Sequence, residues 1–161
     1  MLMVARLITK ACAKSEKNMK LTAKGRYAVM AVSDIAAQGG DAPINLADIS
    51  ARQNISVTYL EQIFAQLRRA DIVQSTRGPG GGYGLSRPAT DIALDSIIYA
   101  VNEDIRAHGC TPELKQSCTG GNAKCLTHNL WGALESHIGD FLAGVTVADV
   151  LADRFGLEAA E

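Results

Sequence analysis

The sequence has few aromatic side chains and no long hydrophobic run. One Trp, three Phe and four Tyr occur among 161 residues, so a hydrophobic core must come mainly from Ala, Val, Ile and Leu, which favours helices. Charged residues interrupt the apolar stretches well before the roughly 20 residues that a bilayer-spanning helix needs. This pattern argues against a membrane-spanning protein and predicts a soluble chain with no membrane partner.

The chain also lacks an excess of charge of one sign, because 16 Lys and Arg stand against 17 Asp and Glu. The two halves differ, however. Residues 1–90 carry 12 basic and 6 acidic side chains, whereas residues 91–161 carry 4 basic and 11 acidic ones. A polyanion such as DNA would therefore be attracted by the first half and repelled by the second.

A convincing export signal is absent as well. In residues 1–18 a short apolar stretch is broken by Arg6 and followed by a Lys-rich run, which is a poor secretory signal. We interpret this segment as a disordered extension or as the product of an upstream start codon, with Met19 opening the folded chain. Three of the four cysteines lie after residue 109, and without export they indicate a reducing, cytoplasmic location and a role as ligands.

Three helices are predicted in the first half of the chain. The first runs from Thr22 to Ala37, and a short one follows Asn45 and ends near Gln53. Ser56 then provides the N-cap of a helix from Val57 to Arg69. Two helices joined by so short a turn are typical of a helix-turn-helix. The apolar face of the first helix is expected to hold Tyr27, Met30, Ala31 and Ile35, and that of the third Val57, Leu60, Ile63, Phe64 and Leu67.

A β-hairpin is predicted directly after these helices. Residues 72–76 and 83–86 have the composition of strands, and the Gly-rich residues 77–82 can only form the connection. A hairpin in this place makes a helix-turn-helix winged. We therefore expect residues 19–90 to form a winged helix-turn-helix DNA-binding domain.

The exposed side of the third helix carries side chains that can contact DNA. Polar groups there could read base edges in the major groove, while nearby cations suit phosphates. Glu61 would either accept from a cytosine amino group or penalise wrong sites. An ordinary solvated face is the alternative. The candidates on the helices are Lys24, Arg26, Ser56, Thr58, Tyr59, Glu61, Gln62 and Arg69.

The tip of the hairpin strengthens the DNA-binding interpretation. Arg77 precedes a run from Gly78 to Gly82 that is nearly free of side chains, with Gly78 and Gly80 as further candidates. Such a thin loop can enter a narrow minor groove, where an arginine is favoured. The run lacks the spacing of a phosphate-binding loop that opens a helix, so nucleotide binding is disfavoured.

The second half combines helices with a stretch that has no periodicity. A helix is predicted from Leu94 to Val101, and another from Thr127 to Leu142, while a capping box at Thr146 opens a last short helix. Between them, residues 104–124 form so long a loop that something should tie it down. An apolar stripe on the longer helix either packs into the core or forms a dimer seam. The seam is favoured because a helix-turn-helix protein usually needs a second copy of itself to bind a palindromic site. The stripe comprises Leu130, Leu134, Ile138 and Phe141.

Cys110, Cys118, Cys125 and His128 form a candidate metal site. Cys125 and His128 are three residues apart near a helix start, so both can face one ion, and the helix dipole favours thiolates there. Three thiolates and one imidazole suit a closed tetrahedral zinc site or a two-iron cluster, and the spacing does not choose between them. A thiol redox switch is a third reading. Since no further residue marks an oxyanion hole or an orienting carboxylate, we do not expect an enzyme.

These residues resemble the BadM/IscR-type family of winged-helix regulators of iron-sulfur cluster assembly. The resemblance covers nearly the whole chain from Met19 to about Phe155. It begins at residues 19–28, continues through residues 46–50 and 56–62, is most specific at the Arg-Gly-Pro-Gly-Gly-Gly-Tyr run of residues 77–83, and closes at Cys-Leu-Thr-His of residues 125–128.

The resemblance implies a homodimeric, cytoplasmic repressor or dual regulator that binds palindromic promoter sites of cluster-assembly genes. It also implies a 2Fe-2S cluster held by Cys110, Cys118, Cys125 and His128, and cluster-assembly scaffold proteins as partners. The gaps between the cysteines look longer than in the family, which keeps zinc open. The expected fold is mainly α: a winged helix-turn-helix with a two-stranded wing, then a cysteine-rich cluster-binding loop and dimerisation helices in residues 91–155, and a tail at 156–161.

Overall fold

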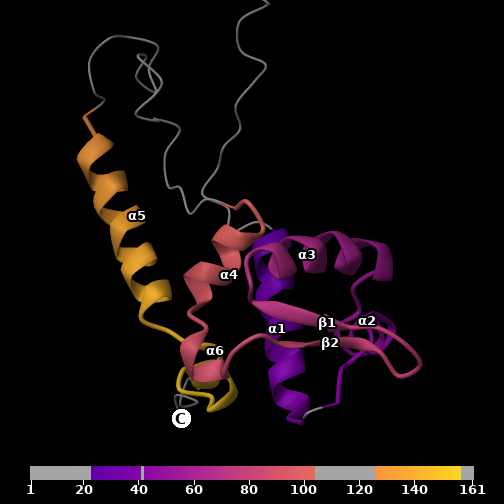
Figure 1. Cartoon of the computed structure of the whole chain (residues 1–161). Helices are drawn as coiled ribbons and strands as arrows, with labels where there is room; N and C mark the ends of the chain where they lie inside the picture. The colour runs from indigo at the N-terminus through magenta and orange to yellow at the C-terminus, as the bar shows by residue number, and fades with distance from the viewer. Residues whose placement is uncertain (1–22, 41, 104–125, 157–161) are drawn as a thin grey trace, which may run out of the picture.

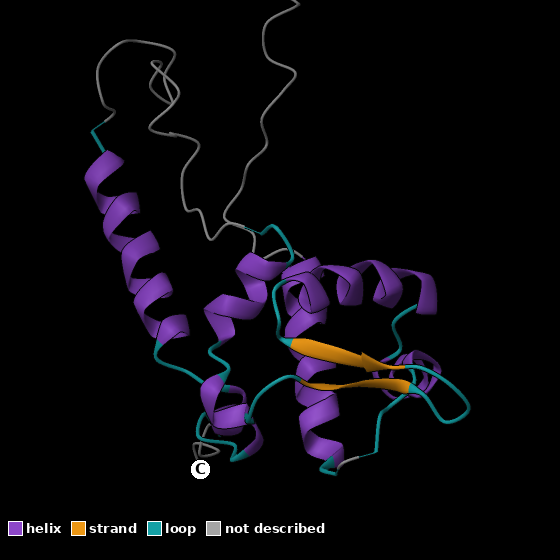
Figure 2. Cartoon of the chain, viewed as in Figure 1, coloured by secondary structure: helices purple, strands orange, loops and turns teal. Residues whose placement is uncertain are grey.

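The computed structural model of the chain describes residues 23–40, 42–103 and 126–156, and its architecture is mainly helical (Figure 1). Three helices precede the two strands, as in a winged helix-turn-helix, and the strands form one antiparallel hairpin (Figure 2). The elements in chain order are α1 (Ala23–Gln38), α2 (Leu46–Gln53), α3 (Val57–Arg69), β1 (Val73–Thr76), β2 (Gly82–Leu85), a 3-10 turn η1 (Ala89–Asp91), α4 (Leu94–Ala100), α5 (His128–Ala143) and α6 (Val147–Leu151).

Side-chain caps begin the two helices of the helix-turn-helix. The Asn45 side chain accepts from the backbone amide of Asp48 at 2.8 Å and so opens α2. Asn54 ends that helix in the left-handed conformation, with φ 53°. The Ser56 hydroxyl then accepts from the amide of Tyr59 at 3.3 Å and opens α3. The predicted bounds of both helices are confirmed.

The wing is an antiparallel hairpin in which Val73 pairs with Leu85 and Thr76 with Gly82. A single residue outside the hairpin, Ile44, also pairs with β2. The amide of Ile44 donates to the Tyr83 carbonyl at 2.9 Å, and the amide of Tyr83 donates back to the Ile44 carbonyl at 2.8 Å. Ile44 directly precedes the cap of α2, so the wing is bonded to the chain that leads into the helix-turn-helix.

One hydrophobic core joins the helices of the first half to α4 and α6. Phe64 of α3 is fully buried, together with Ala28 of α1, Ile97 of α4 and Val147 of α6. The first residue of α4 also bonds to the chain before α6, because the amide of Leu94 donates to the Val145 carbonyl at 2.9 Å. The core therefore crosses the expected domain boundary at residue 90.

Two expectations about buried faces need correction. Val57 is 39% exposed, because it lies one turn before the buried stripe that runs from Leu60 to Leu67. In α1 the buried apolar residues are Ala28, Ala31, Val32 and Ile35, so Tyr27 and Met30 lie at the edge of the stripe and are only half-buried. Small residues let α1 approach its neighbours closely, which moves the larger side chains outward.

The last helices differ in how well the chain covers them. A capping box opens α6 as predicted, and the backbone amide of Thr146, the Arg154 guanidinium and the Thr146 hydroxyl lower the pKa of Asp149 to about 2. By contrast α5 buries none of its residues, and Figure 1 shows it at the edge of the molecule, with α4 between it and α1.

Among the described residues no helix is long and apolar enough to cross a bilayer.

Candidate nucleic-acid interface

The outer face of α3 presents several of the predicted DNA-binding residues to solvent. Burial of Leu60, Ile63, Phe64 and Leu67 fixes the helix in rotation, and the opposite face is then exposed. That face follows a spacing of three, four and seven residues, so its side chains point the same way. Its exposed members are Thr58, Glu61, Gln62 and Arg69, and Ser56 is exposed at the helix start.

Tyr59 differs from its neighbours because it is half-buried. Its ring meets Tyr27 of α1 edge to face, with ring centroids 5.9 Å apart and planes at 89°. Burial raises the pKa of Tyr59, and the negative charge of Glu103 raises it further. The phenol therefore stays protonated at ordinary pH and is held against α1 at the start of α3.

The cations around α3 are not equivalent. Arg26 of α1 is exposed, as expected of a phosphate contact. Lys24, however, donates from its ammonium group to the carbonyl of Val101 at 2.7 Å in a partly buried setting. Arg68 reaches the Ser75 hydroxyl of β1 at 3.4 Å, which links the end of α3 to the wing.

Glycine is required at several positions of the wing tip. Gly78 and Gly80 have φ of +108° and +78°, and the amide of Gly81 donates to the Gly78 carbonyl at 2.9 Å. A Cβ on Gly81 would collide with the Thr76 carbonyl oxygen. Arg77 is exposed at the start of this tight turn. In Figure 1 the loop of the hairpin lies on the side of the molecule opposite to α5.

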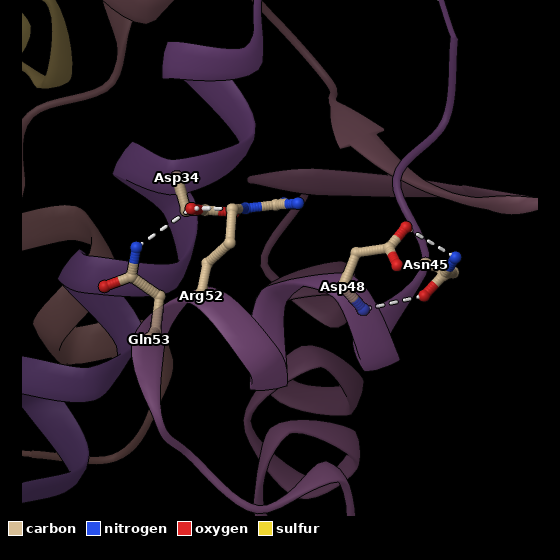
Figure 3. A network of polar contacts seen from close by, with 5 residues as sticks. All are labelled: Asp34, Asn45, Asp48, Arg52 and Gln53. Carbon is tan, nitrogen blue, oxygen red and sulfur yellow. Dashed lines mark hydrogen bonds and ion pairs between the residues drawn. The ribbon is translucent and has the colours of Figure 1, made fainter.

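A partly buried ion pair fixes α2 against α1. The Asp34 carboxylate of α1 is 5% exposed and accepts from Arg52 at 2.6 Å and from Gln53 at 2.9 Å (Figure 3). Burial raises the pKa of Asp34, but the hydrogen bonds from Arg52 and Gln53 and the charge of Arg52 outweigh it, so the pKa lies below its ordinary value. This pair has no local signal in the sequence beyond the place of Asp34 among the apolar residues of α1.

Of the predicted metal ligands, the structure describes His128 alone. It is half-buried at the first position of α5, where the helix dipole favours negatively charged partners. Cys110, Cys118 and Cys125 lie outside the described residues. Within residues 23–40, 42–103 and 126–156 there is no cluster of three or more side chains able to hold a metal ion.

Residues 21–153 match the model of the Rrf2 family, described as iron-dependent transcriptional regulators. The chain belongs to the Rrf2 family. An HTH-type transcriptional regulator IscR of Yersinia pseudotuberculosis serotype O:1b is 48% identical over 143 residues, which cover 89% of this chain and 85% of the relative.

Solved structures of Rrf2-type regulators share the fold. T. potens IscR superposes with a TM-score of 0.66 at 33% identity, covering 86% of this chain and 91% of that one. CymR, the global cysteine regulator of B. subtilis, gives a TM-score of 0.69 at 27% identity over 83% of this chain and 96% of that one. The expected family and winged-helix fold are confirmed, and this Rrf2 chain is an IscR-type, DNA-binding transcriptional regulator and not an enzyme.

Proposed function

We propose that this chain is a homodimeric regulator that senses iron-sulfur cluster status through a 2Fe-2S cluster and controls cluster-assembly genes in the cytoplasm. The observation that carries the proposal is the union, in one IscR-like chain, of an exposed recognition surface with a set of three cysteines and one histidine. Cluster-assembly scaffold proteins are the expected source of the cluster.

The recognition surface contacts both the major and the minor groove of the DNA. Thr58, Tyr59 and Gln62 read base edges in the major groove, and Glu61 accepts from a cytosine amino group or penalises wrong sites. The sugar-phosphate backbone of the DNA is contacted by Ser56, at the cap of α3, and by the cations Arg26 and Arg69. Arg77 enters the minor groove, since Gly78 and Gly80 keep the wing thin beside it.

The cluster would be held by Cys110, Cys118, Cys125 and His128. When bound, it supplies a redox-sensitive group, and a neutral histidine in place of one thiolate raises its reduction potential relative to ligation by four cysteines. His128 opens α5, so it joins the ligand segment directly to the helix that we propose as the dimer seam.

A second copy of the chain is the proposed occupant of the α5 face. Leu130 is 61% and Phe141 56% exposed, and Leu134 and Ile138 on the same stripe are half-buried. Apolar side chains at this spacing in water are stabilised by pairing with an equivalent helix, and a two-fold dimer matches a palindromic DNA site.

The proposal is tested by the visible spectrum and the iron, sulfide and zinc content of protein purified without oxygen. We expect coloured protein with near-equal iron and sulfide. His128→Ala should change the spectrum or lower the iron content, whereas His137→Ala, an exposed histidine of the same helix, should not. Colourless protein with stoichiometric zinc would contradict the cluster and favour a structural zinc site, which the same four ligands also suit. Metal-free protein with reversible thiol oxidation would instead favour a redox switch.

A further inference from the structure

Lys24 makes a bond that a simple phosphate contact would not need. Its ammonium group, in the first turn of α1, donates to the carbonyl of Val101 at 2.7 Å. Val101 is the fully buried C-cap of α4, and that helix end carries partial negative charge on its carbonyl groups. The bond therefore satisfies a helix end and joins two elements that are 77 residues apart in the chain.

The bond lies where the chain leaves the core. After Val101, Asn102 adopts φ of +56° and its amide donates to the Tyr99 carbonyl at 3.0 Å. The amide of Glu103 donates to the Ile98 carbonyl at 3.3 Å, which closes the helix end. From residue 104 the sequence continues towards the first predicted cluster ligand, Cys110.

The recognition helix begins beside the same point. Tyr27, one turn along α1 from Lys24, contacts Tyr59 in the first turn of α3. The carboxylate of Glu103 is near enough to Tyr59 for its charge to help raise the pKa of the phenol, after burial. The first turns of α1 and α3 thus meet the end of α4 in one partly buried junction.

We propose that Lys24 is a positioning residue that couples the ligand-bearing segment to the DNA-reading face. Its bond to Val101 holds the end of α4 against the first turn of α1, so a displacement at residue 103 moves the helices at the interface instead of being absorbed locally. A well-packed junction transmits such a shift because it cannot deform continuously. The inference rests on the proposed function, because only a cluster-dependent segment would use the coupling.

Lys24→Met tests the inference, because methionine keeps much of the apolar stem and loses the charge and the donor. Arg26→Met is the matched control, since it removes an exposed cation two residues away on the same helix. The affinity of each variant is measured with and without the cluster, over a range of salt concentrations. The probe is a labelled duplex selected by the wild-type protein from a random-sequence library. Hydrogen exchange of residues 101–103 is followed in parallel.

For wild type, the affinity with the cluster differs from the affinity without it by a certain ratio. For Lys24→Met we expect this ratio to move towards one, by a factor of about 2 to 30. The salt dependence should be unchanged, and the amides of Asn102 and Glu103 should exchange faster. Arg26→Met should instead weaken both states equally and lower the salt slope by about one.

The inference is wrong if Lys24→Met behaves like Arg26→Met, or if residues 101–103 keep their protection and the affinity ratio stays as in wild type. A wild-type protein whose affinity does not depend on the cluster is a different failure. That result would overturn the proposed function itself, and the coupling with it.

Discussion

The tip of the wing shows how single residues shape the proposed DNA-binding surface. Gly78 and Gly80 adopt positive φ, which bulkier residues rarely do, so the turn after Arg77 is tight and carries little side-chain bulk. The arginine is thus the main charged group that this loop offers to a groove.

Replacing Arg77 by alanine should weaken DNA binding by about tenfold or more, because a guanidinium in a narrow minor groove is lost. Stability should change little, since Arg77 is exposed. Fluorescence anisotropy with a selected duplex measures the first effect and thermal unfolding the second. Arg154→Ala removes the same charge beyond α6 and serves as the control for the DNA-binding measurement alone, because Arg154 pairs with Asp149. An unaltered affinity for Arg77→Ala would refute the minor-groove role.

Asp34 gives a second prediction at this scale, which concerns stability and pH. Because its pKa is lowered on folding, the carboxylate stabilises the fold at neutral pH, and this contribution is lost as the pH falls below the ordinary value of 3.8 towards the folded pKa. Asp34→Asn should therefore lower the free energy of unfolding at neutral pH by about 1–2 kcal/mol, a modest effect because Arg52 is partly exposed.

Urea unfolding of wild type and Asp34→Asn over a series of pH values checks this expectation. The difference between the two proteins should shrink as the pH falls below 3.8. Asp140→Asn, at an exposed position of α5, is the control and should leave the stability at neutral pH nearly unchanged. A difference in the free energy of unfolding that stays constant as the pH is lowered would contradict the role of the ion pair.

At the scale of elements, the contact between Ile44 and β2 joins the wing to α2. A Cβ on Gly82 would collide with the Ile44 carbonyl and lie 2.9 Å from the Asn45 nitrogen, whereas a Cβ on Gly84 would meet nothing within 4 Å. Gly82→Ala should therefore cost about 2–3 kcal/mol of stability and weaken DNA binding, while Gly84→Ala should be nearly neutral. Denaturant unfolding of the pair measures the difference. Equal stabilities would show that Ile44 and β2 separate without cost.

The elements themselves were largely predictable, because their signals are local. Caps such as Asn45 and Ser56, and apolar spacing in α3 and α4, fix helix bounds from a few neighbouring residues. Pairing across the chain has no such signal. Nothing in the residues around Ile44 indicates a partner in β2.

The candidate site shows the same division between local and distant signals. The exposed face of α3 follows from helical spacing alone, because burying Leu60 and Phe64 exposes the opposite side. The burial of Tyr59 against Tyr27 and the bond from Lys24 to Val101 depend on how α1, α3 and α4 pack. Charge alone placed Lys24 among the phosphate contacts, and only the fold shows that its ammonium already has a carbonyl partner.

At the scale of the whole molecule, the exposed stripe of α5 is the proposed dimer interface. Because Leu130 is 61% exposed in the single chain, Leu130→Glu should leave the protomer folded. It should nevertheless weaken the proposed dimer by at least about 30-fold, since a charge would be buried in the seam. Sedimentation equilibrium measures this change. Ser136→Glu, at an exposed position off the stripe, should not dissociate the dimer. A Leu130→Glu protein that remains dimeric would place the interface elsewhere.

The last prediction concerns coupling between the two halves of the molecule. A bound cluster can shift a regulator between two arrangements only by as much as its binding free energy differs between them. Cys118→Ala should remove that difference, so the relative affinities for two promoter duplexes should change while the circular dichroism and the dimer stay as in wild type. Cys12→Ala replaces the cysteine outside the proposed ligand set and should have no effect. Competition binding with both duplexes measures the preference. If Cys118→Ala binds every promoter as wild type does, the ligand-bearing segment does not govern DNA recognition, and the acidic second half of the chain serves dimerisation alone.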